Sequence, residues 1–282
     1  MSNPEIIDGA RTAIRIRRRY PHPIDRVWRA LTEADSLRTW FPTEVSITAE
    51  VGAVVSYGSA GEGRVEVADA PTRLAFTWGD DLLDFELVAD GDATELVLTH
   101  HFDDRAGAAS FATGWEQCLA AVADVLADRR PAEVADRGEA RHEELVTHFA
   151  LDRPVIDRTE TGWRVLFERQ LICEAGVAWD LFFGGSPAPA VGEEFRPFAA
   201  PAAVLGTVTE CEPPAQFSFT TAATEPGDVV RLTLGQGTGH GARLILEVTG
   251  TDEAEIEAAV DQWGAGAIGH VVREAARLGA VS

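Results

Sequence analysis

Two arginines occupy strand positions at which neighbouring apolar residues point to an interior. Arg18 follows Ile16, and Arg169 follows Phe167, at the spacing of two that places side chains on one face of a strand. A buried guanidinium without a partner is very costly, so each arginine must meet an acceptor. We favour a structural partner, either a carboxylate or backbone carbonyls at the sheet edge. The alternative is a carboxylate or phenolate of a ligand, which the planar guanidinium suits.

Three histidines stand where they could serve a site. His100 and His101 are adjacent on a predicted strand, so they face opposite sides and cannot both bind one metal ion. His100 is in phase with Leu98 and should face the interior. A hydrogen-bonded core histidine is the favoured interpretation there, and a general acid–base or a hydrogen-bond donor to a ligand is the alternative. His270 shares a helix face with Trp263, where packing is favoured over a place in a second cavity.

The first half of the chain is rich in large aromatic rings, which can fill a core or line a cavity for an apolar ligand. Most of these rings are expected in the core. Trp40 and Phe41 differ because they stand where short helices meet a loop, so we expect them at the mouth of a cavity. The candidate ligand-binding rings are Trp28, Trp40, Phe41, Tyr57, Trp78, Phe85, Phe111 and Trp115, with Trp263 in the second half.

Sequence motifs for other chemistry are missing. The chain has no P-loop, no GxSxG, no HExxH and no convincing dinucleotide fingerprint. The glycine-rich run 235–241 lies between strand-like segments and is expected to be a hairpin loop. Cys118, Cys173 and Cys211 are odd in number and widely spaced, which argues against a disulfide framework and against a CxxC metal or redox site. We therefore predict no catalytic residue, no metal ligand and no cofactor.

The chain is strongly acidic, with a formal net charge of −22 spread along its length, and all 24 basic residues are arginine. A nucleic-acid partner needs a basic face, and an anionic membrane surface repels an acidic protein. The sequence has no apolar run long enough to span a membrane, and its first residues lack a signal-peptide pattern. These features predict a cytoplasmic protein without nucleic-acid or membrane partners, and they leave the oligomeric state open.

Strands and helices that position these residues follow one order in the first half. A strand over 12–20 leads to a short helix capped by Asp25 and a second short helix from about Ala34. A long helix from about 106 to 127 comes last and carries an apolar stripe. Between them we expect strands over 44–48, 53–57, 63–68, 73–78, 82–88 and 95–102.

Much of this order recurs in the second half. Arg18 and Trp28 are ten residues apart, and so are Arg169 and Trp179. We therefore predict two related domains, 1–128 and 151–282, joined by a charged linker over 129–150. The final helix of the second domain should bury a stripe of Ile256, Val260, Trp263, Ala267 and Val271. Its nearby glycines Gly264, Gly266 and Gly269 indicate a close contact or a distorted helix.

The first half resembles the AHSA1-like branch of the START/Bet v 1-like superfamily. The second domain departs from the pattern because Trp40-Phe41 has no clear counterpart there, and its membership rests on the internal repeat. The resemblance implies an α+β fold of two helix-grip domains, in which a curved antiparallel sheet wraps the C-terminal helix around a cavity. It is carried by Arg18, Pro23, Val27, Trp28, Leu31, Thr32, Trp40, Phe41, Pro71, Leu74, Phe76, Trp78, Thr99, His100, Gly114 and Trp115.

The resemblance determines the fold better than the function. Because the wider superfamily binds lipids, hormones or polyketides, we expect an apolar small molecule to bind in a cavity, mainly in the first domain. A di-domain polyketide cyclase or dehydratase is the alternative, in which Arg18, Tyr57 and His100 would bind an enolate and move protons. An Hsp90-type co-chaperone ranks last, because nothing in the sequence resembles the ATPase-stimulating motif of that activator.

Overall fold

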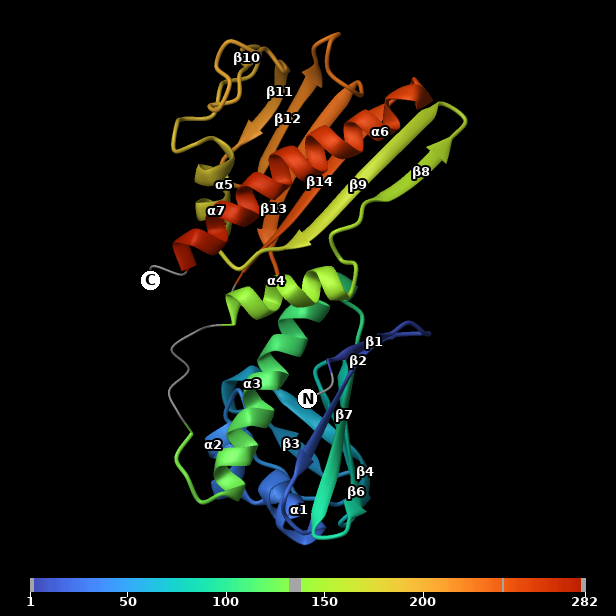
Figure 1. The fold of residues 1–282 in the computed structure, drawn as a ribbon, viewed down its shortest axis with the longest axis vertical. Coiled ribbons are helices and arrows are strands. Elements are labelled where there is room, and N and C mark those ends of the chain that lie inside the picture. The colour runs from blue at the N-terminus through green and yellow to red at the C-terminus, as the bar shows by residue number, and fades with distance from the viewer. Residues whose placement is uncertain (1–2, 132–137, 240, 280–282) are drawn as a thin grey trace. The chain divides into compact units, whose positions relative to one another are not determined.

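The chain divides into two compact units, Met1–Leu145 and Val146–Ser282 (Figure 1). The structure, a computed structural model, describes residues 3–131, 138–239 and 241–279. Within the predicted linker 129–150, residues 132–137 lie outside the described part, and Glu139–His148 forms helix α4. The predicted domain boundaries stay a prediction.

A seven-stranded antiparallel sheet forms the first unit, with strand order β1-β2-β7-β6-β5-β4-β3. Arg18 on β2 lies opposite Leu96 on β7, and Ile14 lies opposite His100. This register puts Arg18 and His100 on the sheet face that carries the buried leucines, as alternation predicted. The strands are β1 Glu5–Ile7, β2 Thr12–Tyr20, β3 Val54–Ser56, β4 Glu62–Asp69, β5 Arg73–Trp78, β6 Asp81–Asp90 and β7 Ala93–Phe102.

One long helix, α3, lies across this sheet (Figure 1). Its residues Trp115, Leu119 and Val122 are buried, and this apolar side holds the helix on the sheet. Two short helices connect β2 to β3 and pack against α3. The helices of the first unit are α1 Ile24–Thr32, α2 Ala34–Trp40, α3 Ala108–Leu126 and the short 3₁₀ turns Gly58–Ala60 and Arg105–Gly107, followed by α4.

Two local predictions for the first unit are wrong. The segment 44–48 is not a strand, because the short edge strand β3 offers it a single bridge, between Ser46 and Ser56. Asp25 does not cap α1. Pro23 occupies the N-cap position in extended conformation, and Asp25 already lies in the first helical turn, where its charge suits the helix dipole.

The second unit repeats the topology, with strand order β10-β11-β12-β13-β14-β9-β8. A final helical segment lies across this sheet as α3 does in the first unit (Figure 1). Between β9, which corresponds to β2, and β10, the described residues form one helix, α5, where the first unit has α1 and α2. The strands are β8 Val155–Thr159, β9 Gly162–Gln170, β10 Glu194–Phe195, β11 Gly206–Glu212, β12 Gln216–Thr221, β13 Val229–Gln236 and β14 Ala242–Gly250.

The final helical segment of this unit is irregular. A π-helical stretch, Val260–Ile268, interrupts the α-helical winding. The helices here are α5 Ala175–Phe182, a 3₁₀ turn Glu253–Glu255, α6 Ile256–Ala259, this π-helix and α7 Gly269–Gly279. A Cβ on Gly264 would lie 2.4 Å from Cε1 of Phe167, so the predicted distortion and the predicted close contact are both present.

The π-helical stretch also changes the buried side. Trp263 and Val271 are buried as predicted, but Val260 and Ala267 are partly exposed. Ile268, five residues after Trp263, is buried instead. A regular helix would use a spacing of three or four, so the wider π turn accounts for the shift of one residue.

Candidate functional site

A cluster of aromatic rings lies between the sheet of the first unit, the end of α2, and α3. We call it the aromatic cluster; the inward-facing sides of β5 and β6 supply part of it, and Trp115 comes from α3. All its rings are buried except Trp78, which is partly exposed. Its members are Trp40, Phe41, Tyr57, Phe76, Trp78, Phe85 and Trp115.

Phe41 is at the centre of the aromatic cluster. Its ring centroid lies 5.5 Å from that of Trp78, 5.8 Å from that of Trp115 and 6.3 Å from that of Tyr57. Tyr57 stacks on Trp78 with centroids 5.0 Å apart. The structure thus places Phe41 and Trp40 inside the unit, and their expected role at a cavity mouth stays a prediction.

Polar atoms within the aromatic cluster already have partners. The indole N–H of Trp40 donates to the carbonyl of Ala30 at 2.8 Å, and the hydroxyl of Tyr57 donates to the carbonyl of Thr77 at 2.7 Å. Burial raises the pKa of the Tyr57 hydroxyl above its ordinary value, so it stays protonated. The interior of the aromatic cluster therefore presents mostly ring surface, and the indole of Trp40 and the hydroxyl of Tyr57 already have their acceptors.

His100 lies at the border of the aromatic cluster, between a carboxylate and an indole. Its Nε2 lies 3.0 Å from Oδ2 of Asp81, and its Nδ1 lies 3.1 Å from Nε1 of Trp115. An indole N–H can only donate, so Nδ1 accepts and Nε2 carries the hydrogen that is donated to Asp81. Both ring nitrogens are thereby occupied, as expected of a hydrogen-bonded core histidine.

His101 faces the opposite side of the sheet, as strand alternation predicted. Burial lowers the pKa of His101, which keeps its imidazole neutral near pH 7. Within the part of the chain that the structure describes, no group of three or more histidine, cysteine and acidic side chains is arranged to hold a metal ion.

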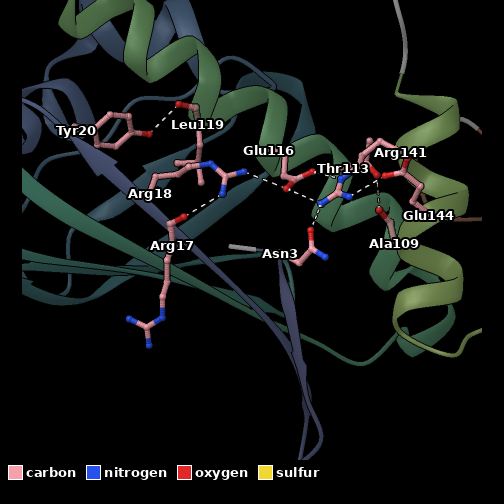
Figure 2. A network of polar contacts seen from close by, with 10 residues as sticks. All are labelled: Asn3, Arg17, Arg18, Tyr20, Ala109, Thr113, Glu116, Leu119, Arg141 and Glu144. Atoms are coloured by element: carbon pink, nitrogen blue, oxygen red, sulfur yellow. Dashed lines mark hydrogen bonds and ion pairs between the residues drawn. The ribbon is translucent and has the colours of Figure 1, made fainter. Parts of the chain in front are cut away.

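Arg18 reaches α3 and shares a carboxylate there with a second arginine (Figure 2). Nη2 of Arg18 lies 3.1 Å from Oε1 of Glu116, and Nε of Arg141 lies 2.8 Å from Oε2 of the same residue. Burial by itself would raise the pKa of Glu116, but the hydrogen bonds from Arg141 and Arg18 outweigh it and lower that pKa. Glu116 is thus the carboxylate partner that the structural interpretation of Arg18 requires.

Two further candidates of the first unit lie beside the aromatic cluster. The ring of Phe111 lies 4.6 Å from the imidazole of His100 and 4.6 Å from the ring of Phe102. Trp28 lies on α1 and is partly exposed. A groove of about 490 Å³ lies between α1, α2 and the end of α3, but no member of the aromatic cluster lines it.

In the second unit the candidates are spread over the sheet and the final helices. Arg169 is buried on β9, and the indole N–H of Trp263 donates to the carbonyl of Pro226 at 3.1 Å. The ring of His270 lies 5.1 Å from that of Phe198, which is partly exposed to solvent.

Sequence reasoning missed a second group of rings in this unit. Phe182 and Phe183 end α5, with centroids 5.1 Å apart at 76°, much as Trp40 and Phe41 end α2 at 5.4 Å and 71°. Both phenylalanines contact Phe217 on β12. The pair resembles Trp40-Phe41 in ring geometry, and the prediction that Trp40-Phe41 has no clear counterpart in the repeat stays a prediction; the Phe-Phe pair next to a helix end was the signal for these rings.

Residues 21–127 match the family described as activator of Hsp90 ATPase homolog 1-like protein. No curated protein matches the chain. Within the described residues, no helix is both long and apolar enough to cross a membrane.

Three solved structures are similar to this chain. CalU16 from Micromonospora echinospora is 24% identical, and the match covers 52% of this chain and 95% of that chain with a TM-score of 0.44. A conserved protein of unknown function from Enterococcus faecalis is 20% identical over 52% and 91% of the two chains, with a TM-score of 0.45. DynU16, from the dynemicin biosynthetic locus, is 15% identical over 93% and 98%, with a TM-score of 0.40.

Proposed function

We propose that this chain, whose first unit belongs to the AHSA1-like family of helix-grip proteins over residues 21–127, binds an apolar, ring-containing small molecule inside that unit. The observation that supports the proposal is the aromatic cluster, in which seven rings from five parts of the fold meet between the sheet and α3. Rings on several sides can contact both faces and the edges of a flat ligand.

The class of ligand follows from the polar groups of the aromatic cluster and from their hydrogen bonds. The indole of Trp40 and the hydroxyl of Tyr57 already donate to backbone carbonyls. A ligand with many donors and acceptors would lose its own hydrogen bonds to water without replacement. A flat molecule with few polar groups fits this environment best.

Binding is favoured over acid–base catalysis by the state of His100. A general acid or base needs a nitrogen within hydrogen-bond reach of the substrate. Both nitrogens of His100 are occupied, one by Asp81 and the other by Trp115. Proton transfer to a substrate would first require one of these bonds to break.

Phe41 is the ring most suited to make room for a ligand. It follows the last residue of α2, where the backbone leaves the helix in extended conformation, and it contacts five other rings. A ligand ring in its place would keep most of these contacts. The side chain of Phe41 should therefore control affinity.

The test is a fluorescence titration of the full chain with the neutral probe N-phenyl-1-naphthylamine. We expect saturable binding, and we expect Phe41→Leu to lower the dissociation constant by about fivefold or more, because the smaller side chain leaves more room for the ligand ring that takes the place of Phe41. Phe198→Leu, at a partly exposed ring of the second unit, is the matched control and should leave the constant unchanged. Absence of probe binding, or equal constants for both variants and the natural chain, would contradict the proposal.

A further inference from the structure

We propose that Asp81, His100 and Trp115 form an acid-sensitive latch that holds the aromatic cluster closed. The latch consists of two hydrogen bonds in series. Asp81 accepts from Nε2 of His100 at 3.0 Å, and Nδ1 of His100 accepts from the indole of Trp115 at 3.1 Å. Its effect on ligand exchange rests on the proposed function, whereas its effect on Trp115 does not.

The chemistry of the imidazole makes the latch sensitive to acid. Nε2 already carries a hydrogen, so a second proton can bind only at Nδ1. That proton would face the N–H of Trp115, and two donors cannot share one hydrogen bond. Protonation of His100 therefore breaks the bond that holds Trp115.

Asp81 and Trp115 act in opposite directions on the protonation of His100: the carboxylate favours the imidazolium, and the indole N–H favours the neutral imidazole. Asp81 is partly exposed, so it connects the buried imidazole to water, and its charge favours the imidazolium. Arg11 lies 3.6 Å from Asp81 and weakens that charge only partly, because it also pairs with Asp103 at 2.7 Å. The groups that face or adjoin His100 are Asp81 from β6 with Arg11 behind it, His101 and Phe102 from β7, and Phe111 and Trp115 from α3.

Loss of this bond would loosen the interior. Trp115 is 5% exposed, and a buried N–H without an acceptor is costly, so the indole must turn toward another acceptor or toward water. Its ring lies 5.8 Å from that of Phe41 and 6.3 Å from that of Phe85. A turn of Trp115 changes both contacts and opens the side of the aromatic cluster formed by α3.

Three other buried tryptophans lack this sensitivity. The indoles of Trp40, Trp163 and Trp263 donate to backbone carbonyls, which do not titrate. Trp115 instead donates to the imidazole of His100, a side chain that can be protonated at the accepting nitrogen. The contrast with Trp40, in the same cluster, provides an internal reference.

Hydrogen exchange of the indole N–H groups, followed by NMR on the nitrogen-15-labelled full chain, tests the latch without a ligand. We expect the exchange rate of Trp115 relative to Trp40 to rise about tenfold or more on acidification from about pH 8 to about pH 5, the range in which histidines titrate. A ratio that stays constant across this range overturns the proposal, and the natural chain alone decides it.

Variants assign the effect to the two hydrogen bonds. Asp81→Asn should move the transition of Trp115 to lower pH, because the nearby negative charge is gone. Asp103→Asn, which touches Arg11 but not His100, is the matched control and should move it far less. Equal shifts in the two variants would contradict the latch.

Ligand exchange is measured separately. The dissociation rate of N-phenyl-1-naphthylamine should rise across the same transition and should lose that dependence in Trp115→Phe, which keeps a ring but has no N–H. A probe that does not bind contradicts the proposed function and leaves the indole measurement to decide the latch. If the probe binds but its dissociation rate does not change across the pH transition of Trp115, the link between the latch and the ligand is contradicted.

Discussion

The three cysteines show how burial changes the chemistry of a side chain. Burial raises the pKa of the Cys118 thiol to about 12, on the helix that covers the sheet. It also raises the pKa of Cys173 and of Cys211, although less strongly. Since the thiolate is the reactive form, the three cysteines should differ in reactivity.

We expect iodoacetamide to alkylate Cys211 at least about tenfold faster than Cys118 at neutral pH, because the thiol of Cys118 forms far less thiolate. Mass spectrometry of peptides after timed quenching measures both rates. In denaturant the rates should become equal. A faster reaction of Cys118 in the folded chain would show that the helix does not shield it.

Arg18 and His100 mark the limit of sequence reasoning at this scale. Alternation along each of their strands predicted that both side chains face the interior, and they do. Their partners Glu116, Asp81 and Trp115 come from other elements, and no local pattern connects them. The face of the sheet to which a side chain points follows from alternation along the strand, but the identity of its hydrogen-bond partner follows from how the elements pack together.

Helix α3 is held in place by polar contacts of Glu116 as well as by its buried apolar residues. Glu116 binds Arg18 on β2 and Arg141 on α4, so one carboxylate joins three elements (Figure 2). The carboxylate and Arg18 are largely buried, with side-chain exposures of 17% and 10%. Removing such a charge leaves partners without an acceptor.

Glu116→Gln should lower the free energy of unfolding by about 2 kcal/mol at pH 7, measured by denaturant titration. Asp90→Asn is the matched control: it breaks the exposed pair with Arg19 and should cost less than about 0.5 kcal/mol. A similar loss in both variants would contradict a special role for Glu116.

The pH dependence of stability should identify the same carboxylate. The folded state lowers the pKa of Glu116 below its ordinary value of 4.5, so its contribution is present above that pH and is lost as the pH falls through the folded-state value. Glu116→Gln lacks this ionisation. Its unfolding free energy should therefore fall less steeply than that of the natural chain as the pH decreases below about 4.5.

Among the elements, regular alternation was the reliable predictor. The bounds of β2 and β5 agree with the sequence, because both strands alternate cleanly and end at prolines, glycine or other turn residues. The expected strand 44–48 lacked a partner of sufficient length, which a single segment cannot reveal. Strand β1, three residues long, gave no periodic signal.

The whole molecule consists of two units that share one topology but differ in their rings. The core of the second unit is built around Trp179, Phe183, Phe217 and Trp263, and that of the first around the aromatic cluster. Each unit thus has an apolar interior of its own. The repeat of strand order was visible in the sequence, whereas the Phe-Phe pair of α5 was not recognised because it lies at another point of the repeat.

Fragments 1–148 and 149–282 should therefore fold separately. Each should show a cooperative thermal transition and near-ultraviolet circular dichroism from its buried tryptophans, and the sum of the two spectra should approximate that of the full chain. A fragment without a cooperative transition would mean that its core depends on the other part of the chain.

The π-helical stretch of the second unit has a consequence for how this sequence tolerates change. Between Trp263 and Ile268 the chain contains one residue more than an α-helix needs to bring both side chains to the same side. Deleting a residue from a regular helix rotates everything that follows by about 100°. Here, deletion of the exposed Ala265 would convert the stretch to α-helix and keep Val271 and Ala275 facing inward. A one-residue deletion, which disrupts the packing of most helices, would here restore regular α-helical geometry.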